Sequence, residues 1–146
     1  MSIVIDISQE GKEIPMRKKT TDPLTPAEWN IMKIVWELGN AGSREIHEIA
    51  KIRHDWAVTT VKTILGNLVD KKILKARIDG NKFIYSPAKP AFKLLAQAAD
   101  ALMARSVDSV KGQLLCYMAG KIHLSKDDID ELQALIDEQK EKEERS

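Results

Sequence analysis

The clearest periodic pattern in the chain runs from Asp55 to Lys72, where apolar residues recur every three or four positions. This spacing places them on one stripe of an α-helix that faces a core. The stripe consists of Val58, Val61, Ile64, Leu65 and Leu68. The opposite face has no carboxylate before Asp70 and consists of Thr59, Thr60, Lys62, Thr63, Gly66 and Asn67. The pattern predicts a two-faced helix, and Asp55 is expected to cap it because the alanine at position 57 caps poorly.

Two shorter helical patterns precede this segment. Thr25, Pro26 and Glu28 have the spacing of a capping box with proline at the first helical position, which predicts a helix from Pro26 to about Gly39. Ser43 is placed to cap a second, short helix with apolar residues at positions 46, 49, 50 and 52. A short helix, a tight turn and a longer two-faced helix are typical of a helix-turn-helix.

A β-hairpin pattern follows the third helix. Residues 73–77 and 82–86 alternate as two strands, and the turn between them contains Gly80, which tolerates positive φ. Basic side chains lie near the tip of this hairpin, at Lys75, Arg77 and Lys82. Three helices and a hairpin predict a winged helix-turn-helix domain over residues 24–87, in a fold that is mainly α.

Residues 88–146 predict further helices, and a capping-box pair at Ser125 and Asp128 marks the start of the last one. The winged helix already closes a core, so these apolar stripes need another chain to cover them, and we expect a homodimer. The expected dimerisation residues are Leu114, Leu115, Met118, Ile129, Leu132, Leu135 and Ile136. The tail after Gln139 is expected to fray.

Composition and charge set limits on the function. The net charge is +1, but residues 25–90 carry eleven Lys and Arg against seven Asp and Glu, which favours a polyanionic partner for this half. Residues 1–23 predict a flexible extension whose basic stretch 17–19 could touch phosphates or remain solvated. No apolar run is long enough to cross a membrane, and no signal peptide is expected, so a cytoplasmic location is predicted.

Catalytic and metal-binding motifs are absent from the sequence. One cysteine and three scattered histidines supply too few ligands for a metal site within one chain, and no nucleophile with its base can be assembled. We therefore predict no enzyme activity, no cofactor and no metal.

The polar face of the third helix suits the DNA major groove, where base edges present hydrogen-bonding groups between flanking phosphates. Thr59, Thr60 and Thr63 are the predicted contacts to base edges. The predicted phosphate contacts are Ser43, Arg44, Lys62, Arg77 and Lys82. Two alternatives stay open: the threonines could form an ordinary solvated face, or the domain could be a protein-interaction module without specific DNA binding.

From about Leu24 to Lys140 the chain resembles the penicillinase-repressor family, which includes β-lactamase, methicillin-resistance and copper-responsive repressors. The resemblance is carried by the segments LTPAEWNIMKIVWELGNAGSREI, HDWAVTTVKTILGNLVDKKIL, GNKFIYSP and LSKDDIDELQALID. It implies a dimeric winged-helix repressor that binds a palindromic operator in double-stranded DNA through its third helix.

The sequence departs from parts of this family. Copper-responsive members end in a CxC…CxC cluster, and this tail has no cysteine, so direct copper sensing is not expected. Some antibiotic-responsive members are cleaved by a regulatory protease at an Asn-Phe bond, and the matching position here is Ala101-Leu102. The sequence leaves relief by proteolysis open.

Overall fold

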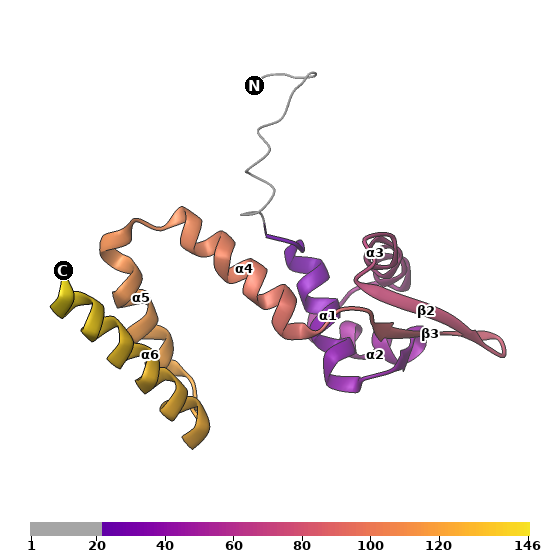
Figure 1. Cartoon of the computed structure of the whole chain (residues 1–146). Coiled ribbons are helices and arrows are strands. Elements are labelled where there is room, and N and C mark those ends of the chain that lie inside the picture. The colour runs from indigo at the N-terminus through magenta and orange to yellow at the C-terminus, as the bar shows by residue number, and fades with distance from the viewer. Residues whose placement is uncertain (1–21) are drawn as a thin grey trace, which may run out of the picture. The chain divides into compact units, whose positions relative to one another are not determined.

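The computed structural model describes residues 22–146, so most of the predicted N-terminal extension lies outside the described residues. Within the described part, six helices and one three-stranded antiparallel sheet confirm the mainly α, winged-helix prediction (Figure 1). The chain divides into two compact units, one ending at Arg105 and the other running from Ser106 to Ser146. The functional division at residue 87 stays a prediction.

Helix α1 spans Pro26–Leu38 and begins where the sequence predicts. The Thr25 hydroxyl accepts a hydrogen bond from the Glu28 N–H at 3.2 Å, and the Glu28 carboxylate accepts one from the Thr25 N–H at 2.9 Å. Gly39 ends the helix with a φ of 85°, a conformation that glycine adopts without strain. Both ends are therefore set by local sequence.

Helix α2 spans Ser43–His54 and helix α3 spans Val58–Asp70. The N-cap residue predicted for each of these helices is wrong. Ser43 is the first helical residue of α2, and the N-cap is Gly42, whose N–H donates to the Glu45 carboxylate at 3.0 Å. Asp55 ends α2 in the left-handed region with a φ of 58°, so it does not begin α3. Asp, like Asn, tolerates this conformation better than most residues do.

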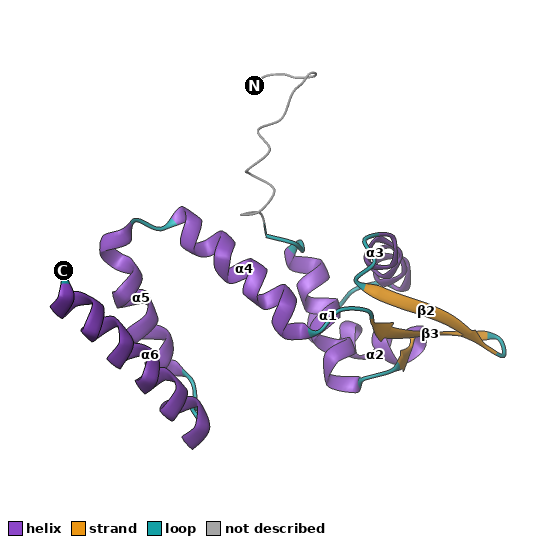
Figure 2. Ribbon diagram, in the orientation of Figure 1, coloured by secondary structure: helices purple, strands orange, loops and turns teal. Residues whose placement is uncertain are grey.

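The sheet has the order β1-β3-β2 and consists of Ala41–Gly42, Lys82–Pro87 and Leu74–Asp79 in that order. Strands β2 and β3 form the predicted wing, which projects beyond the helices (Figure 2). Strand β1 was not predicted. Its two residues pair with Ile84 and Tyr85 of β3 and join the start of α2 to the hairpin.

A single core holds the winged helix together. Buried side chains come from the three helices and from strands β1 and β2, and the fully buried ones include Ile31, Val35, Ile46, Leu65, Leu68 and Leu74. Helix α4, Ala91–Arg105, contributes Leu94 to the same core. Val58 was expected in the buried stripe of α3 but is 45% exposed, because α3 begins at this residue.

The C-terminal unit consists of α5, Asp108–Lys121, and α6, Lys126–Arg145. Ser125 and Asp128 form the predicted capping box at the start of α6, with Asp128 N–H donating to the Ser125 hydroxyl at 3.0 Å. The helix continues past Gln139, where fraying is predicted, and carries ion pairs one turn apart such as Lys142 with Glu138. No residue of either helix is buried within this chain.

Candidate nucleic-acid interface

The polar face of α3 is exposed as the sequence predicts. Its core face is fixed by Val61, Ile64, Leu65 and Leu68, all buried. The side chains turned to solvent are Thr59, Thr60, Lys62, Thr63 and Asn67, with Gly66 between them. Since packing fixes the rotation of the helix, the structure brings the three predicted base-contacting threonines together on one surface.

Hydrogen bonding limits what Thr63 can do. Its hydroxyl donates to the backbone carbonyl of Thr59 at 3.0 Å, one turn earlier. The hydroxyl proton is therefore engaged, while the oxygen lone pairs and the methyl group remain available. Thr63 is equipped to accept a hydrogen bond from a base amino group or to touch a thymine methyl.

Gly66 lies on the same exposed stripe as Thr59 and Thr63, at the i, i+4, i+7 spacing. A Cβ added here would meet no atom within 4 Å, so the fold itself does not require glycine. Glycine inside a helix costs about 0.5 to 1 kcal/mol relative to alanine. A glycine with that cost and no packing role marks a place where a partner surface can approach the helix backbone.

The first turn of α3 takes no side-chain cap. Ala57 is its N-cap residue, and the turn contains no acidic side chain. In contrast, α1 and α6 each have a capping box and a carboxylate in the first turn. Free backbone N–H groups and the positive end of the helix dipole favour a phosphate at such a terminus.

The two predicted phosphate contacts on α2 differ in quality. Ser43 is half-buried at the start of the helix. Arg44 is exposed, but its guanidinium lies 3.8 Å from the carboxylate of Glu48. Both side chains are solvated, so this ion pair is weak and a phosphate can compete for Arg44.

Within the described part of the chain, the cations of the wing have no ion-pair partner. Arg77 and Lys82 are exposed, and within residues 22–146 neither they nor Lys62 on α3 form a salt bridge. Two exposed apolar residues next to these cations along the strands, Ile78 and Phe83, were not predicted from the sequence. The alternation of the hairpin would have placed both on one face.

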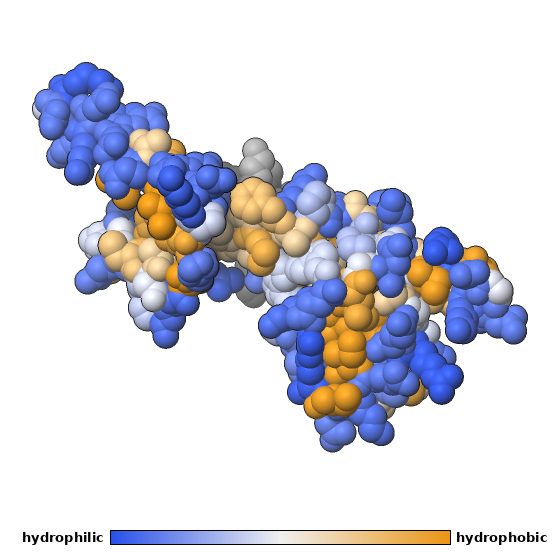
Figure 3. Space-filling view, turned by 90° about the horizontal axis from the view of Figure 1, so that it is seen from below, coloured by the Kyte–Doolittle hydropathy of each residue, from blue (hydrophilic) through white to orange (hydrophobic). Residues whose placement is uncertain are grey.

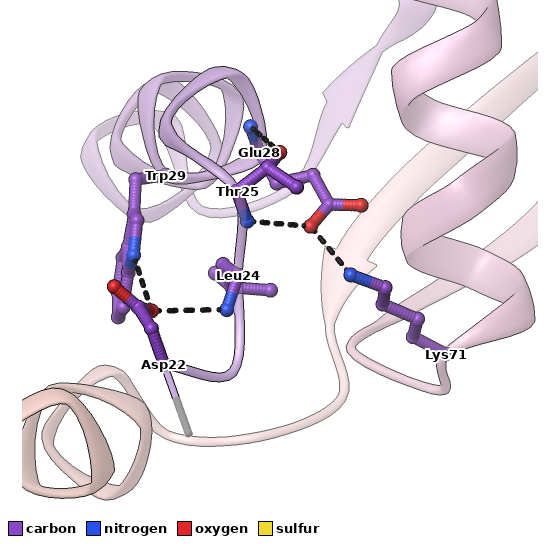
Figure 4. A network of polar contacts seen from close by, with 6 residues as sticks. All are labelled: Asp22, Leu24, Thr25, Glu28, Trp29 and Lys71. Carbon is purple, nitrogen blue, oxygen red and sulfur yellow. Dashed lines mark hydrogen bonds and ion pairs between the residues drawn. The ribbon is translucent and has the colours of Figure 1, made fainter. Parts of the chain in front are cut away.

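A polar network anchors the C-terminal end of α3 to the start of α1 (Figure 4). The Lys71 ammonium, just after α3, lies 2.6 Å from the buried carboxylate of Glu28. Burial raises the pKa of Glu28, but hydrogen bonds from Lys71 and Thr25 outweigh it and hold the pKa below its ordinary value of 4.5. The carboxylate therefore stays charged and ties the polar-faced helix to the core.

Asp22 extends this network on the other side of α1. Its carboxylate accepts hydrogen bonds from the Trp29 indole at 2.9 Å and from the Leu24 N–H at 3.1 Å. Trp29 and Trp36 pack against the core with ring centroids 6.3 Å apart. These contacts support an anchoring role for both tryptophans.

The predicted dimerisation residues lie on exposed or half-exposed surface of the C-terminal unit. An open groove of about 300 Å³ runs between α5 and α6, and its apolar lining includes Leu115, Met118, Leu132 and Leu135. Figure 3 shows hydrophobic side chains of this unit lying between hydrophilic ones. Leu114 is half-buried, while Ile129 and Ile136 are exposed.

The predicted cleavage position lies inside helix α4. Ala101 is 2% exposed and Leu102 is exposed. A protease needs an extended chain, so cleavage at this bond would require local opening of α4.

Residues 22–146 contain neither a metal-ligand cluster nor a membrane-spanning helix. No group of three or more His, Cys, Asp or Glu side chains is arranged to hold a metal ion. No helix in this range is both long and apolar enough to cross a membrane.

Comparison with known proteins identifies the family. A sequence model of the penicillinase repressor family matches residues 24–138. An uncharacterized 16.5 kDa protein in the ptsI 3′ region of Latilactobacillus sakei is 34% identical over 118 residues, 81% of each chain. The penicillinase repressor of Bacillus licheniformis is 21% identical over 122 residues, which cover 84% of this chain and 95% of that protein. The solution structure of the DNA-binding domain of the repressor BlaI is similar over 49% of this chain and 89% of that one, with 25% identity and a TM-score of 0.46. The match over residues 24–138 shows that the chain belongs to the penicillinase repressor family.

Proposed function

We propose that this chain is a transcriptional repressor that binds a palindromic DNA operator as a homodimer. The observation that carries the proposal is the exposed face of α3, which offers hydroxyls, an amide and an ammonium and no carboxylate before Asp70. A solvated helix face normally mixes both charge signs, whereas this surface matches base edges flanked by phosphates. The family and the name of its Bacillus licheniformis member support a repressor role.

The residues divide by chemistry into base contacts and phosphate contacts. Thr59, Thr60 and Thr63 face the base edges, with Thr63 acting as an acceptor or through its methyl group. The phosphate contacts are Ser43, Arg44, Lys62, Arg77 and Lys82. The free N–H groups of the first turn of α3 add a contact that needs no side chain.

The C-terminal unit supports the proposed dimerisation. Helices α5 and α6 bury no residue within one chain and leave apolar side chains exposed, among them Leu115, Leu135 and Ile136. About forty residues without a core do not fold stably alone, so a second copy covers this surface. A twofold dimer presents two α3 helices to two half-sites about 34 Å apart, which makes the operator palindromic.

Release from DNA has one candidate route in this chain. Cleavage at Ala101-Leu102 would separate α5 and α6 from the winged helix and so disrupt the dimer. Because Ala101 is buried in α4, such cleavage would depend on local opening of that helix. A repressor of this kind acts where the chromosome lies, in the cytoplasm.

The test is a DNA titration with the full-length protein. Labelled duplexes selected by the protein from a random-sequence pool are compared with unselected duplexes over a series of salt concentrations. We expect two chains per selected duplex, a palindromic consensus, and an affinity whose logarithm falls linearly with the logarithm of salt concentration. A protein-interaction module would show no salt-dependent binding to any duplex, and that outcome would refute the proposal.

A further inference from the structure

The two faces of the wing have different chemistry. Strands β2 and β3 pair Ile78 directly with Phe83, so both side chains lie on one face of the hairpin. Arg77 and Lys82 occupy the alternating positions and lie on the other face, where Asp79 is the direct cross-strand partner of Lys82. Near its tip the wing is therefore apolar on one side and charged on the other, with two cations and one carboxylate.

The apolar face continues a surface that packs on the core. Leu74 and Tyr85 belong to this face, and both contact the same core as the buried side of α3. Beyond them Ile78 is 71% exposed and Phe83 is 51% exposed. The exposed apolar pair thus lies on the side of the hairpin that packs against the helices, including α3.

Phe83 is held in place although it is exposed. Its ring lies 6.5 Å from that of Tyr85, centroid to centroid, and Tyr85 is half-buried against the core. The turn beyond is tight, with Gly80 at a φ of 67° between the strands. A supported aromatic ring near a narrow tip is suited to contact a partner with little loss of conformational freedom.

The size of the patch limits its partner. A stable protein interface covers about 800 Å² on each partner, and two side chains at a hairpin tip fall far short of that area. The sugar–phosphate backbone of DNA fits better, because deoxyribose is apolar and lies next to anionic phosphates. Arg77 and Lys82 form no ion pair with any residue of 22–146, and each is next to one of the apolar pair along its strand, with its side chain on the opposite face.

We propose that the wing tip contacts the operator backbone through both of its faces, with Ile78 and Phe83 against deoxyribose sugars and Arg77 and Lys82, on the other face, against phosphates. The inference rests on the proposed DNA-binding function and adds a contact that does not depend on charge. Counterion release accompanies only the phosphate contacts. The two faces of the wing therefore predict different responses to salt.

The experiment compares single variants of the full-length protein on one duplex, selected by the wild-type protein from a random-sequence pool. Phe83→Ala and Ile78→Ala should each weaken binding by about fivefold to tenfold, with a salt slope parallel to that of the wild type. Lys82→Ala should weaken binding and make the slope shallower by about 0.9. Thermal unfolding of each variant checks that it is folded. Because Ile78 is more exposed than Phe83, Ile78→Ala is less expected to disturb the fold than Phe83→Ala.

Matched controls exist elsewhere on the surface. Phe92 on α4 and Ile52 on α2 are 80% and 84% exposed, and neither lies on the wing. Phe92→Ala and Ile52→Ala should bind the duplex like the wild type. Hydroxyl-radical footprinting, which cleaves at accessible deoxyribose, should show that Phe83→Ala loses protection at sugars beside each half-site.

The outcomes of this experiment distinguish a failure of the wing contact from a failure of the proposed DNA-binding function. A wild-type protein that shows no salt-dependent DNA binding would overturn both. A wild-type protein that binds, together with Phe83→Ala and Ile78→Ala variants of unchanged affinity or unchanged sugar protection, would overturn the wing contact alone.

Discussion

Replacing Glu28 by glutamine removes one negative charge from a buried site and keeps the shape of the side chain. The side chain of Glu28 is 5% exposed and that of Lys71 is 41% exposed. Glutamine can still accept the hydrogen bond from the Thr25 N–H, which preserves the capping box. What the variant loses is the charge that faces Lys71 at the end of α3.

The expected loss follows from the strength of charged and neutral hydrogen bonds. A bond to a charged group contributes about 1.5 to 3 kcal/mol and a neutral one about 0.5 to 1.5 kcal/mol. Lys71 is partly exposed, so water replaces part of what it loses and the difference lies at the low end. We expect Glu28→Gln to lower the free energy of unfolding by about 1 kcal/mol at neutral pH, measured by urea denaturation.

The same variant predicts a pH dependence. The pKa of Glu28 in the folded chain lies below 4.5, and the unfolded chain titrates near that ordinary value. A carboxylate with a lowered folded pKa stabilises the fold above the unfolded pKa, and this contribution is lost as the pH falls through the folded pKa. The difference between wild type and Glu28→Gln should therefore be constant near neutral pH and shrink below about pH 4.5.

A control separates burial from pairing. Glu37 lies 2.8 Å from Arg53, but both side chains are about 40% exposed. Glu37→Gln should cost no more than about 0.5 kcal/mol. Equal losses for the two variants, or a Glu28→Gln difference that does not change with pH, would show that charge at the buried site does not anchor α3.

Three further predictions concern binding and assembly. Lys62→Ala should weaken binding to selected and unselected duplexes alike and make the salt slope shallower by about 0.9, and an unchanged slope would remove Lys62 from the phosphate contacts. Gly66→Ala should raise the free energy of unfolding by about 0.5 to 1 kcal/mol and yet weaken DNA binding. The control is Gly112→Ala, at an equally open helical site on α5, which should not affect the DNA contact. Wild-type affinity in Gly66→Ala would place that glycine away from DNA. Leu135→Glu should shift the protein to monomers in analytical ultracentrifugation, while Ala134→Glu, at an exposed position that does not line the groove between α5 and α6, should remain dimeric. A dimeric Leu135→Glu would contradict the proposed interface.

The sequence predicted those parts of the fold that depend on neighbouring residues. The capping boxes at Thr25 and Ser125 involve groups three residues apart, so the pattern itself contains the interaction. Strand β1 could not be predicted in the same way. It has two residues, too few for alternation, and its partners in β3 lie far along the chain.

The cap at Asp55 shows why a local pattern can predict the wrong boundary. An aspartate between two helical patterns can cap the second helix or end the first in the left-handed region, and both uses suit its side chain. In this chain Asp55 adopts the left-handed conformation, within a turn in which the rings of His54 and Trp56 stack with centroids 4.5 Å apart. That stacking is a contact of the folded turn, which residue types alone do not contain.

In the candidate interface, too, features set by local sequence could be predicted and features set by contacts between distant residues could not. The exposed face of α3 could be predicted because its buried stripe has helical period and fixes the rotation of the helix. The salt bridge between Glu28 and Lys71 could not, since its partners are 43 residues apart. The apolar face of the wing depends on strand register, which the two-residue turn at Gly80 determines.

The C-terminal helices show a different limit of sequence periodicity. The spacing of Ile129, Leu132 and Ile136 indicates an apolar stripe, but the same spacing suits a core within the chain and an interface between chains. The structure excludes the first for this unit, because neither α5 nor α6 buries a residue. A face that is too apolar for water and unburied within its own unit requires a partner. In the proposed homodimer, a second copy of the same chain would supply a matching apolar face by symmetry and would also bring a second α3 to the DNA.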